Sequence, residues 1–156
     1  MSWSVSLPAL LGTVLGASVT LLADRIRWRR DHALLSQKTR REVYAAYLAA
    51  LHTGSERIRA VVLGDATAAD RLSAAGEAFR AAGVYQAREH VALLASEAVA
   101  CSAGQVLYRL RDLRDLAARG LSPASSDYEH AVMRYDEALT DLRTAMRQDI
   151  GSTSGG

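Results

Sequence analysis

Cysteine, proline, lysine and phenylalanine are scarce in this chain of 156 residues, which has one cysteine, two prolines, one lysine and one phenylalanine. The single cysteine, Cys101, excludes a disulfide framework and a multi-cysteine zinc site, and it suits a reducing compartment. Because proline interrupts the helical hydrogen-bond ladder, its scarcity leaves long stretches free to form helices. Cys101 lies within an apolar helical pattern, so we expect it to be a small core residue.

Charged residues are absent from the first 23 positions. An uncharged, largely apolar run of about 20 residues is long enough to cross the hydrocarbon core of a bilayer as a helix. Basic residues follow this run directly, at Arg25, Arg27, Arg29 and Arg30. None precedes it, which is the reverse of the charge order in a cleaved signal peptide.

We therefore predict that residues 1–23 are an uncleaved single-pass anchor in the cell membrane, with the N-terminus outside and the C-terminal body in the cytoplasm. A cleaved signal and a buried apolar helix are the alternatives. Trp3 and Trp28 are 25 positions apart, about 37 Å along a helix, which fits the two interfacial belts of a bilayer. We predict that these tryptophans and the four arginines lie at the membrane interface.

Small residues recur every fourth position within the predicted anchor, at Gly12, Gly16 and Thr20. This spacing lets two helix backbones approach closely in a membrane, so it predicts self-association of the anchor and a possible homo-oligomer. The alternative is that this face contacts lipid only.

Residues 24–42 are predicted to form a basic helical stalk next to the membrane. Positions 24–41 contain seven basic and two acidic side chains, whereas positions 42–156 contain twelve basic and fifteen acidic ones. Basic charge beside a membrane attracts anionic lipid headgroups. Nucleic acid is a less favoured partner, because the rest of the chain is mildly acidic and has no base-reading motif.

Residues 43–150 are predicted to form an all-α, antiparallel up-down bundle of about four helices that continues from the transmembrane helix, and residues 151–156 a flexible tail. Apolar positions recur in steps of three and four, as expected for helices that each bury one face. The expected core positions are Tyr44, Leu48, Leu51, Ser55, Ile58 and Val62 in the first helix; Leu72, Ala75, Phe79, Val84, Ala87, Val91 and Leu94 in the second; Val99, Ala103, Val106, Leu110, Leu113 and Ala117 in the third; and Tyr128, Val132, Tyr135, Leu139, Leu142, Met146 and Ile150 in the fourth.

The ends of the helices are marked by residues that favour caps and breaks. Thr67 is predicted to cap the second helix, which Gly76 and Gly83 weaken, and Ser96 to cap the third. The alternative is one long helix through Ser96. Gly120 is expected to close the third helix, because glycine readily adopts the left-handed backbone conformation that follows many helices.

No catalytic residue, cofactor site or metal site is predicted. A helical di-iron site needs two Glu-x-x-His motifs, and the nearest fragment is a single Asp127-x-x-His130. Asp112 and Asp115 stand among arginines three or four residues away, which indicates a solvated ion-pair face. Several of the six tyrosines occupy predicted core positions, so we expect core packing with the hydroxyls at its rim, the alternative being a ligand pocket lined by tyrosine and histidine.

Four segments carry a resemblance to other proteins: Val14–Ala23, the arginine-rich Arg25–Arg30, Arg41–Leu51 with its Tyr-x-x-Tyr-Leu run, and Leu93–Val99. Together they resemble a class of short, mostly uncharacterised actinobacterial single-pass membrane proteins with an N-terminal anchor, a basic stalk and a helical cytoplasmic body. The predominance of arginine over lysine also suits a GC-rich genome. The resemblance implies the anchor and a helix break at Ser96, and it implies no activity.

These features favour a non-enzymatic helical bundle that is tethered to the cytoplasmic face of the membrane and acts as a protein-interaction or scaffold module. The expected partners are the lipid bilayer with its anionic headgroups, and either a second copy or another protein. The alternative is a regulatory or sensory module, in which a ligand or the state of the membrane shifts the packing of the helices.

Overall fold

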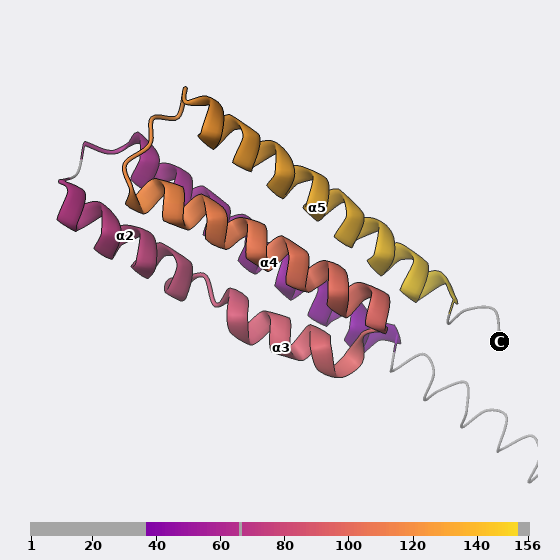
Figure 1. Ribbon diagram of the computed structural model, residues 1–156. Helices are drawn as coiled ribbons and strands as arrows, with labels where there is room; N and C mark the ends of the chain where they lie inside the picture. Colours follow the sequence, from indigo (N-terminus) through magenta and orange to yellow (C-terminus); the bar gives the residue numbers. More distant parts are fainter. Residues whose placement is uncertain (1–36, 66, 153–156) are drawn as a thin grey trace, which may run out of the picture. The chain divides into compact units, whose positions relative to one another are not determined.

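The computed structural model describes residues 37–65 and 67–152, and these residues form helices without a β-strand. The first described helix, which we call the N-terminal helix, covers residues 37–63. It is followed by α2 (Ala68–Ala81), α3 (Val84–Leu94), α4 (Glu97–Ala118) and α5 (Ser126–Ser152) (Figure 1). The described residues from 39 onward, 39–65 and 67–152, belong to one compact unit.

Helix α4 occupies the middle of the unit, with α5 packed on one side and with α2 and α3 packed on another (Figure 1). The N-terminal helix completes the bundle, because its tyrosine hydroxyls reach both α4 and α5. Successive helices run in opposite directions, with α2 and α3 forming one broken rod. The predicted all-α bundle of about four helices is confirmed for the described residues.

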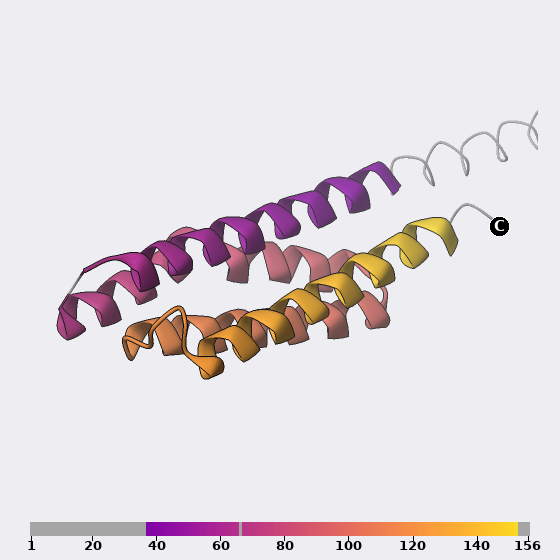
Figure 2. The ribbon, with the colours of Figure 1, turned by 90° about the horizontal axis from the view of Figure 1, so that it is seen from above.

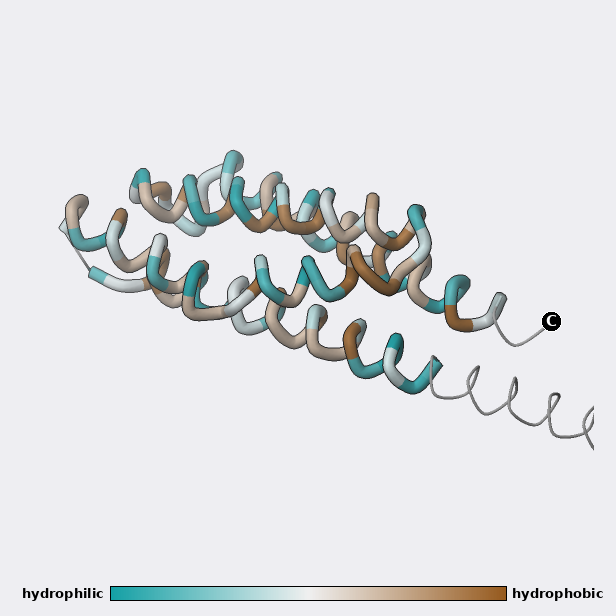
Figure 3. Tube along the Cα trace, turned by 90° about the horizontal axis from the view of Figure 1, so that it is seen from below, coloured by the Kyte–Doolittle hydropathy of each residue, from teal (hydrophilic) through white to brown (hydrophobic). Residues whose placement is uncertain are grey.

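The core comes from the predicted stripes on the helices. Apolar residues recur at intervals along each helix instead of forming one continuous block (Figure 3). All six core positions predicted on α4 are buried. The largest fully buried side chains are Tyr47, Phe79, Leu51, Ile58, Leu110, Leu142, Val84, Val91, Val99 and Val106.

The predicted helix caps at Thr67 and Gly120 are confirmed. The backbone N–H of Asp70 donates to the Thr67 hydroxyl oxygen at 3.3 Å, which satisfies one donor that the first turn leaves free. Gly120 has φ of 74°. Its N–H donates to the carbonyl of Ala117, and the N–H of Leu121 donates to that of Leu116. This pair of bonds is the Schellman motif, which left-handed glycine permits.

The rod formed by α2 and α3 is broken at Gly83, one of the two glycines that were predicted to weaken the second helix. Gly83 has φ of 66°, in the left-handed region that L side chains avoid, so α2 ends before it and α3 starts after it. The alternative of one helix running through Ser96 is wrong. Ala95 and Ser96 both have extended backbones, with ψ of 161° and 160°, which separates α3 from α4.

Three predicted core positions are exposed. Leu72 is 65% exposed, and it lines an open hollow together with Gly76 and Ala118. Cys101 is exposed on α4. It lies two residues from both Val99 and Ala103, or about 200° around a helix, and so on the opposite face. Leu94, in the last turn of α3, is 38% exposed.

The predicted anchor over residues 1–23 and residues 24–36 of the predicted stalk lie outside the described residues, as do residues 153–156 of the tail. Within residues 37–65 and 67–152, no helix is both long and apolar enough to span a bilayer.

We predict that Gly83→Ala lowers the free energy of unfolding by about 1 kcal/mol, because alanine is strained at this positive φ. The matched control is Gly76→Ala within α2, where the added methyl group meets only the flexible end of Arg80 and should leave stability equal or higher. Urea unfolding followed by circular dichroism measures both. Equal losses in the two variants would contradict the strain at Gly83.

Candidate functional site

A groove follows the seam between the N-terminal helix and α5, and we call it the α5 groove. Figure 2 shows the first residues of the N-terminal helix near the last residues of α5. Three hollows open along this seam, and each is lined by residues of both helices. The α5 groove is therefore the main concave feature that the described residues offer to a ligand or partner.

The hollow at the end near residue 41 has a volume of about 350 Å³. It combines an apolar floor with basic side chains at its edge. Among the described residues, its three arginines form no ion pair with a carboxylate. The lining residues are Tyr44, Ala45, Leu48, Met146 and Ile150, with Arg41, Arg143 and Arg147.

The middle hollow is smaller, about 190 Å³, and more polar. Two of its hydroxyl groups are already engaged, since Tyr135 donates to the carbonyl of Leu51 at 3.2 Å and Ser55 donates to that of His52 at 2.9 Å. Its charged groups are balanced, with two arginines and two carboxylates. Its polar lining consists of His52, Ser55, Glu56, Arg59, Tyr128, Tyr135, Asp136 and Arg143.

The hollow at the far end of the α5 groove is the largest, at about 630 Å³. It is mainly apolar, and two of its residues, Leu63 and Met133, are 66% and 53% exposed. Val62, Val132 and Pro123 extend the apolar lining. Contiguous apolar surface of this kind is typical of interaction sites, whereas isolated exposed residues are ordinary.

A buried carboxylate, that of Asp149, joins three helices at the end of the groove near residue 41. The Tyr44 hydroxyl donates to Asp149 Oδ2 at 2.6 Å, and Arg40 Nη1 lies 3.3 Å from the same oxygen. Ser96, at the start of α4, donates to Asp149 through its side chain and its backbone. We call this cluster the Asp149 junction.

The surroundings of Asp149 favour its charged form. Burial would raise the pKa of this carboxyl, but the hydrogen bonds from Tyr44 and Ser96 and the charge of Arg40 together lower it below its ordinary value. A charged carboxylate near an α4 backbone N–H also suits the positive end of the helix dipole. Asp149 is therefore an ionised structural group at neutral pH.

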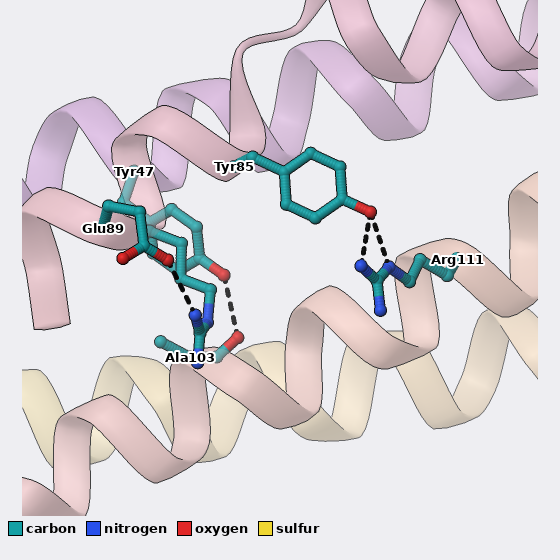
Figure 4. A network of polar contacts seen from close by, with 6 residues as sticks. Tyr47, Tyr85, Glu89, Ala103 and Arg111 are labelled. Carbon is teal, nitrogen blue, oxygen red and sulfur yellow. Dashed lines mark hydrogen bonds and ion pairs between the residues drawn. The ribbon is translucent and has the colours of Figure 1, made fainter.

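The predicted place of the tyrosine hydroxyls, at the rim of the core, is wrong for the N-terminal helix. Tyr47 is fully buried, and its hydroxyl donates to the carbonyl of Ala103 on α4 at 2.8 Å (Figure 4). Tyr44 likewise donates to buried Asp149. Burial raises the pKa of Tyr44, Tyr47, Tyr128 and Tyr135. These hydroxyls fix the register of the helices.

A second polar contact, on the outer side of α3 and α4, uses an exposed tyrosine. Arg111 Nε donates to the Tyr85 hydroxyl at 2.9 Å (Figure 4). The Tyr85 ring packs edge-on against Phe79, with ring centroids 5.2 Å apart, and Arg114 lies 5.1 Å from the centroid of Phe79. This cluster covers the break between α2 and α3, and its groups are engaged with one another.

The ion-pair face predicted on α4 is found in part. Arg109 lies 3.5 Å from Asp112 at the predicted spacing of three, whereas Asp115 pairs with the adjacent Arg114 at 2.7 Å. Such partly exposed pairs contribute tenths of a kcal/mol each. Within the described part of the chain, no group of three or more histidine, cysteine, aspartate or glutamate side chains is placed to hold a metal ion.

The residues predicted to contact the membrane cannot be placed in this geometry. Trp3, Trp28 and the four arginines between positions 25 and 30 lie outside the described residues, as do Gly12, Gly16 and Thr20 of the predicted self-association face. The Asp149 junction was not predicted, and of the α5 groove only the middle hollow, lined by His52, Tyr128 and Tyr135, corresponds to the alternative of a pocket lined by tyrosine and histidine. The only signal for Asp149 is its place one residue before Ile150, at the edge of a predicted apolar stripe.

Comparisons of this chain with protein-family models, with curated proteins and with solved structures give no match.

We predict that Asp149→Asn lowers the free energy of unfolding by about 2 kcal/mol at pH 7, since charge-assisted hydrogen bonds are lost. Because the folded-state pKa is lowered, this stabilisation is present above the ordinary Asp pKa near 4 and is lost as the pH falls. The wild-type and variant curves should converge below that pH. Urea unfolding at several pH values tests this, with the exposed Asp141→Asn as control. A constant difference would contradict it.

We predict that the stability of the bundle falls as the pH rises above 10. The four buried tyrosines have raised pKa values, so they stay protonated in the folded state while the unfolded chain loses protons. Tyr47→Phe should cost about 1 kcal/mol at pH 7 and make the alkaline decline less steep. Unfolding between pH 7 and 11 measures both, and identical slopes for variant and wild type would refute the assignment of Tyr47.

Proposed function

We propose that this chain is a non-enzymatic helical bundle that is tethered to the cell membrane and binds a protein partner. The tether is the uncharged run of residues 1–23, whose basic flank orients the body toward the cytoplasm. Arginines 25 to 30 and the two tryptophans fix the tether at the interface. The bundle is the recognition element, and the tether raises its local concentration at the membrane.

The observation that carries the proposal is the apolar hollow at the far end of the α5 groove. Leu63 and Met133 come from different helices, line the same hollow of about 630 Å³, and are each more than half exposed. Exposing two large apolar side chains to water is unfavourable in free energy, and burying them against apolar side chains of a partner would recover that free energy. Glu129 and His130 stand beside them and supply a polar rim, as interfaces require.

The partner that fits this hollow is a protein segment with two or three apolar side chains on one face, such as an amphipathic helix. Helix-in-groove recognition uses apolar anchors that enter a groove between two helices. The hollow is open and lined by both helices, so a partner helix can lie along the seam. Self-association through Gly12, Gly16 and Thr20 is compatible with this role, because it would give one assembly two such hollows.

A regulatory or sensory module is the second candidate, and the middle hollow of the α5 groove favours it. This hollow of about 190 Å³ has balanced charges and several hydroxyl groups between two helices. A small polar ligand held there would contact both helices and shift their packing. Such a ligand would raise the melting temperature of the bundle in proportion to the logarithm of its concentration.

We predict that a photo-crosslinking residue at Met133 in the full chain captures one defined protein in the cells that produce this chain. The same residue at Leu93, which is 80% exposed on α3 and lines none of the three hollows, is the control. Leu63→Asp should reduce capture at Met133 at least tenfold, because a charge would be buried at the interface. Stability should change by less than about 0.5 kcal/mol.

Equal capture at positions 133 and 93, or capture that Leu63→Asp leaves unchanged, would contradict the proposed surface. Capture of nothing but a second copy would identify the bundle as a self-assembly module. The tether is tested separately by flotation of the full chain with neutral lipid vesicles.

A further inference from the structure

The three arginines at the end of the α5 groove near residue 41 form a concentrated positive charge. Arg41 comes from the N-terminal helix, and Arg143 and Arg147 come one turn apart from α5. None of the residues that line this hollow is acidic. By contrast, Arg40 is paired with the buried Asp149 at 3.3 Å. Among the described residues none of the three arginines forms an ion pair with a carboxylate, although Arg143 also lines the middle hollow with Glu56 and Asp136.

The floor between these arginines is apolar, and it is rigid. Tyr44 and Met146 are buried residues of the core, and Leu48 and Ile150 pack against them. The Tyr44 hydroxyl is held by Asp149, which fixes the position of its ring. A hollow of about 350 Å³ with this floor fits a hydrocarbon chain, whereas a free phosphate or a nucleic-acid backbone would leave the apolar surface of Ala45 and Leu48 uncovered.

We infer that this hollow is a binding site for an anionic membrane phospholipid. The phosphate lies among Arg41, Arg143 and Arg147, and the upper part of one acyl chain covers Ala45 and Leu48, the exposed and half-buried apolar residues of the lining. Arginine suits this role, because its guanidinium group binds phosphate oxygens in a bidentate manner and is weakly hydrated. The site would seat the bundle on the membrane in one orientation, with the apolar hollow near Leu63 at the opposite end.

The membrane is the source of this ligand, a step that rests on the tether of the proposed function. Residue 41 follows the predicted anchor by 18 positions, so the tether keeps the hollow within reach of the headgroups. Tethering raises the effective concentration of headgroups at the hollow far above that of any soluble anion.

The test reconstitutes the full chain in vesicles of phosphatidylcholine alone or with about one-third phosphatidylglycerol, and measures amide hydrogen exchange by segment. Anionic lipid should slow exchange in residues 41–48 and 143–150 about tenfold, with no change in α2 and α3. The double variant Arg143→Gln/Arg147→Gln should lose this protection. The control Arg57→Gln/Arg119→Gln removes the same charge from exposed positions outside the hollow and should keep it. Circular dichroism verifies that both variants are folded.

The outcomes separate three questions, which are the existence of the site, the source of its ligand and the presence of the tether. Anionic protection that is lost only in the hollow variant supports the site. Equal exchange in both kinds of vesicle, or protection that both double variants retain or both lose, would overturn it. Protection by soluble laurate without any by the vesicles would overturn the membrane as the source. Failure of the full chain to float with phosphatidylcholine vesicles would instead overturn the tether, so the two failures are distinguishable.

Discussion

The carboxylate of Asp149 is the constraint on which this end of the bundle depends. A buried charge is costly unless its oxygens are fully paired, and here Tyr44, Arg40 and Ser96 supply the partners. Those partners come from the N-terminal helix and from the start of α4, so three helices meet at one group. Apolar stripes can slide past each other by small amounts, whereas this junction permits one register.

The same junction shapes the α5 groove. The Tyr44 hydroxyl donates a hydrogen bond to Asp149, and the same residue lines the neighbouring hollow. One side chain therefore contributes both to the junction between the helices and to the lining of the groove. Arg40 is bound to Asp149, while Arg41, the next residue, lines the groove. Adjacent arginines thus have separate roles, one structural and one available to an anion. The two arginines carry the same charge, and they differ in role because adjacent residues of a helix point in different directions.

The periodicity of apolar residues predicted most of the fold. Most of the features that it did not predict depend on hydrogen bonds between polar groups that are far apart in the sequence. The steps of three and four identified the buried face of α4 because its apolar residues contact α5, α2 and α3. Tyr47 was not placed at the centre of the core, since the carbonyl of Ala103 that accepts its proton is remote in sequence. Asp149 was missed because a charged residue in a helix is ordinarily exposed. Cys101 was predicted to lie in the core because it stands within an apolar pattern, but its angular position on α4 directs it away from the buried face. The α5 groove could not be derived either, since it depends on which two helices are neighbours.

The distance in sequence between Tyr44 and Asp149, 105 residues, also sets an order of events during synthesis. The N-terminal helix is synthesised before the helices that carry its polar partners. Its Tyr47 hydroxyl has no acceptor until α4 has been made, and Tyr44 none until α5 has been made. Until then the apolar face of the N-terminal helix stays uncovered, so its burial depends on the last described helix.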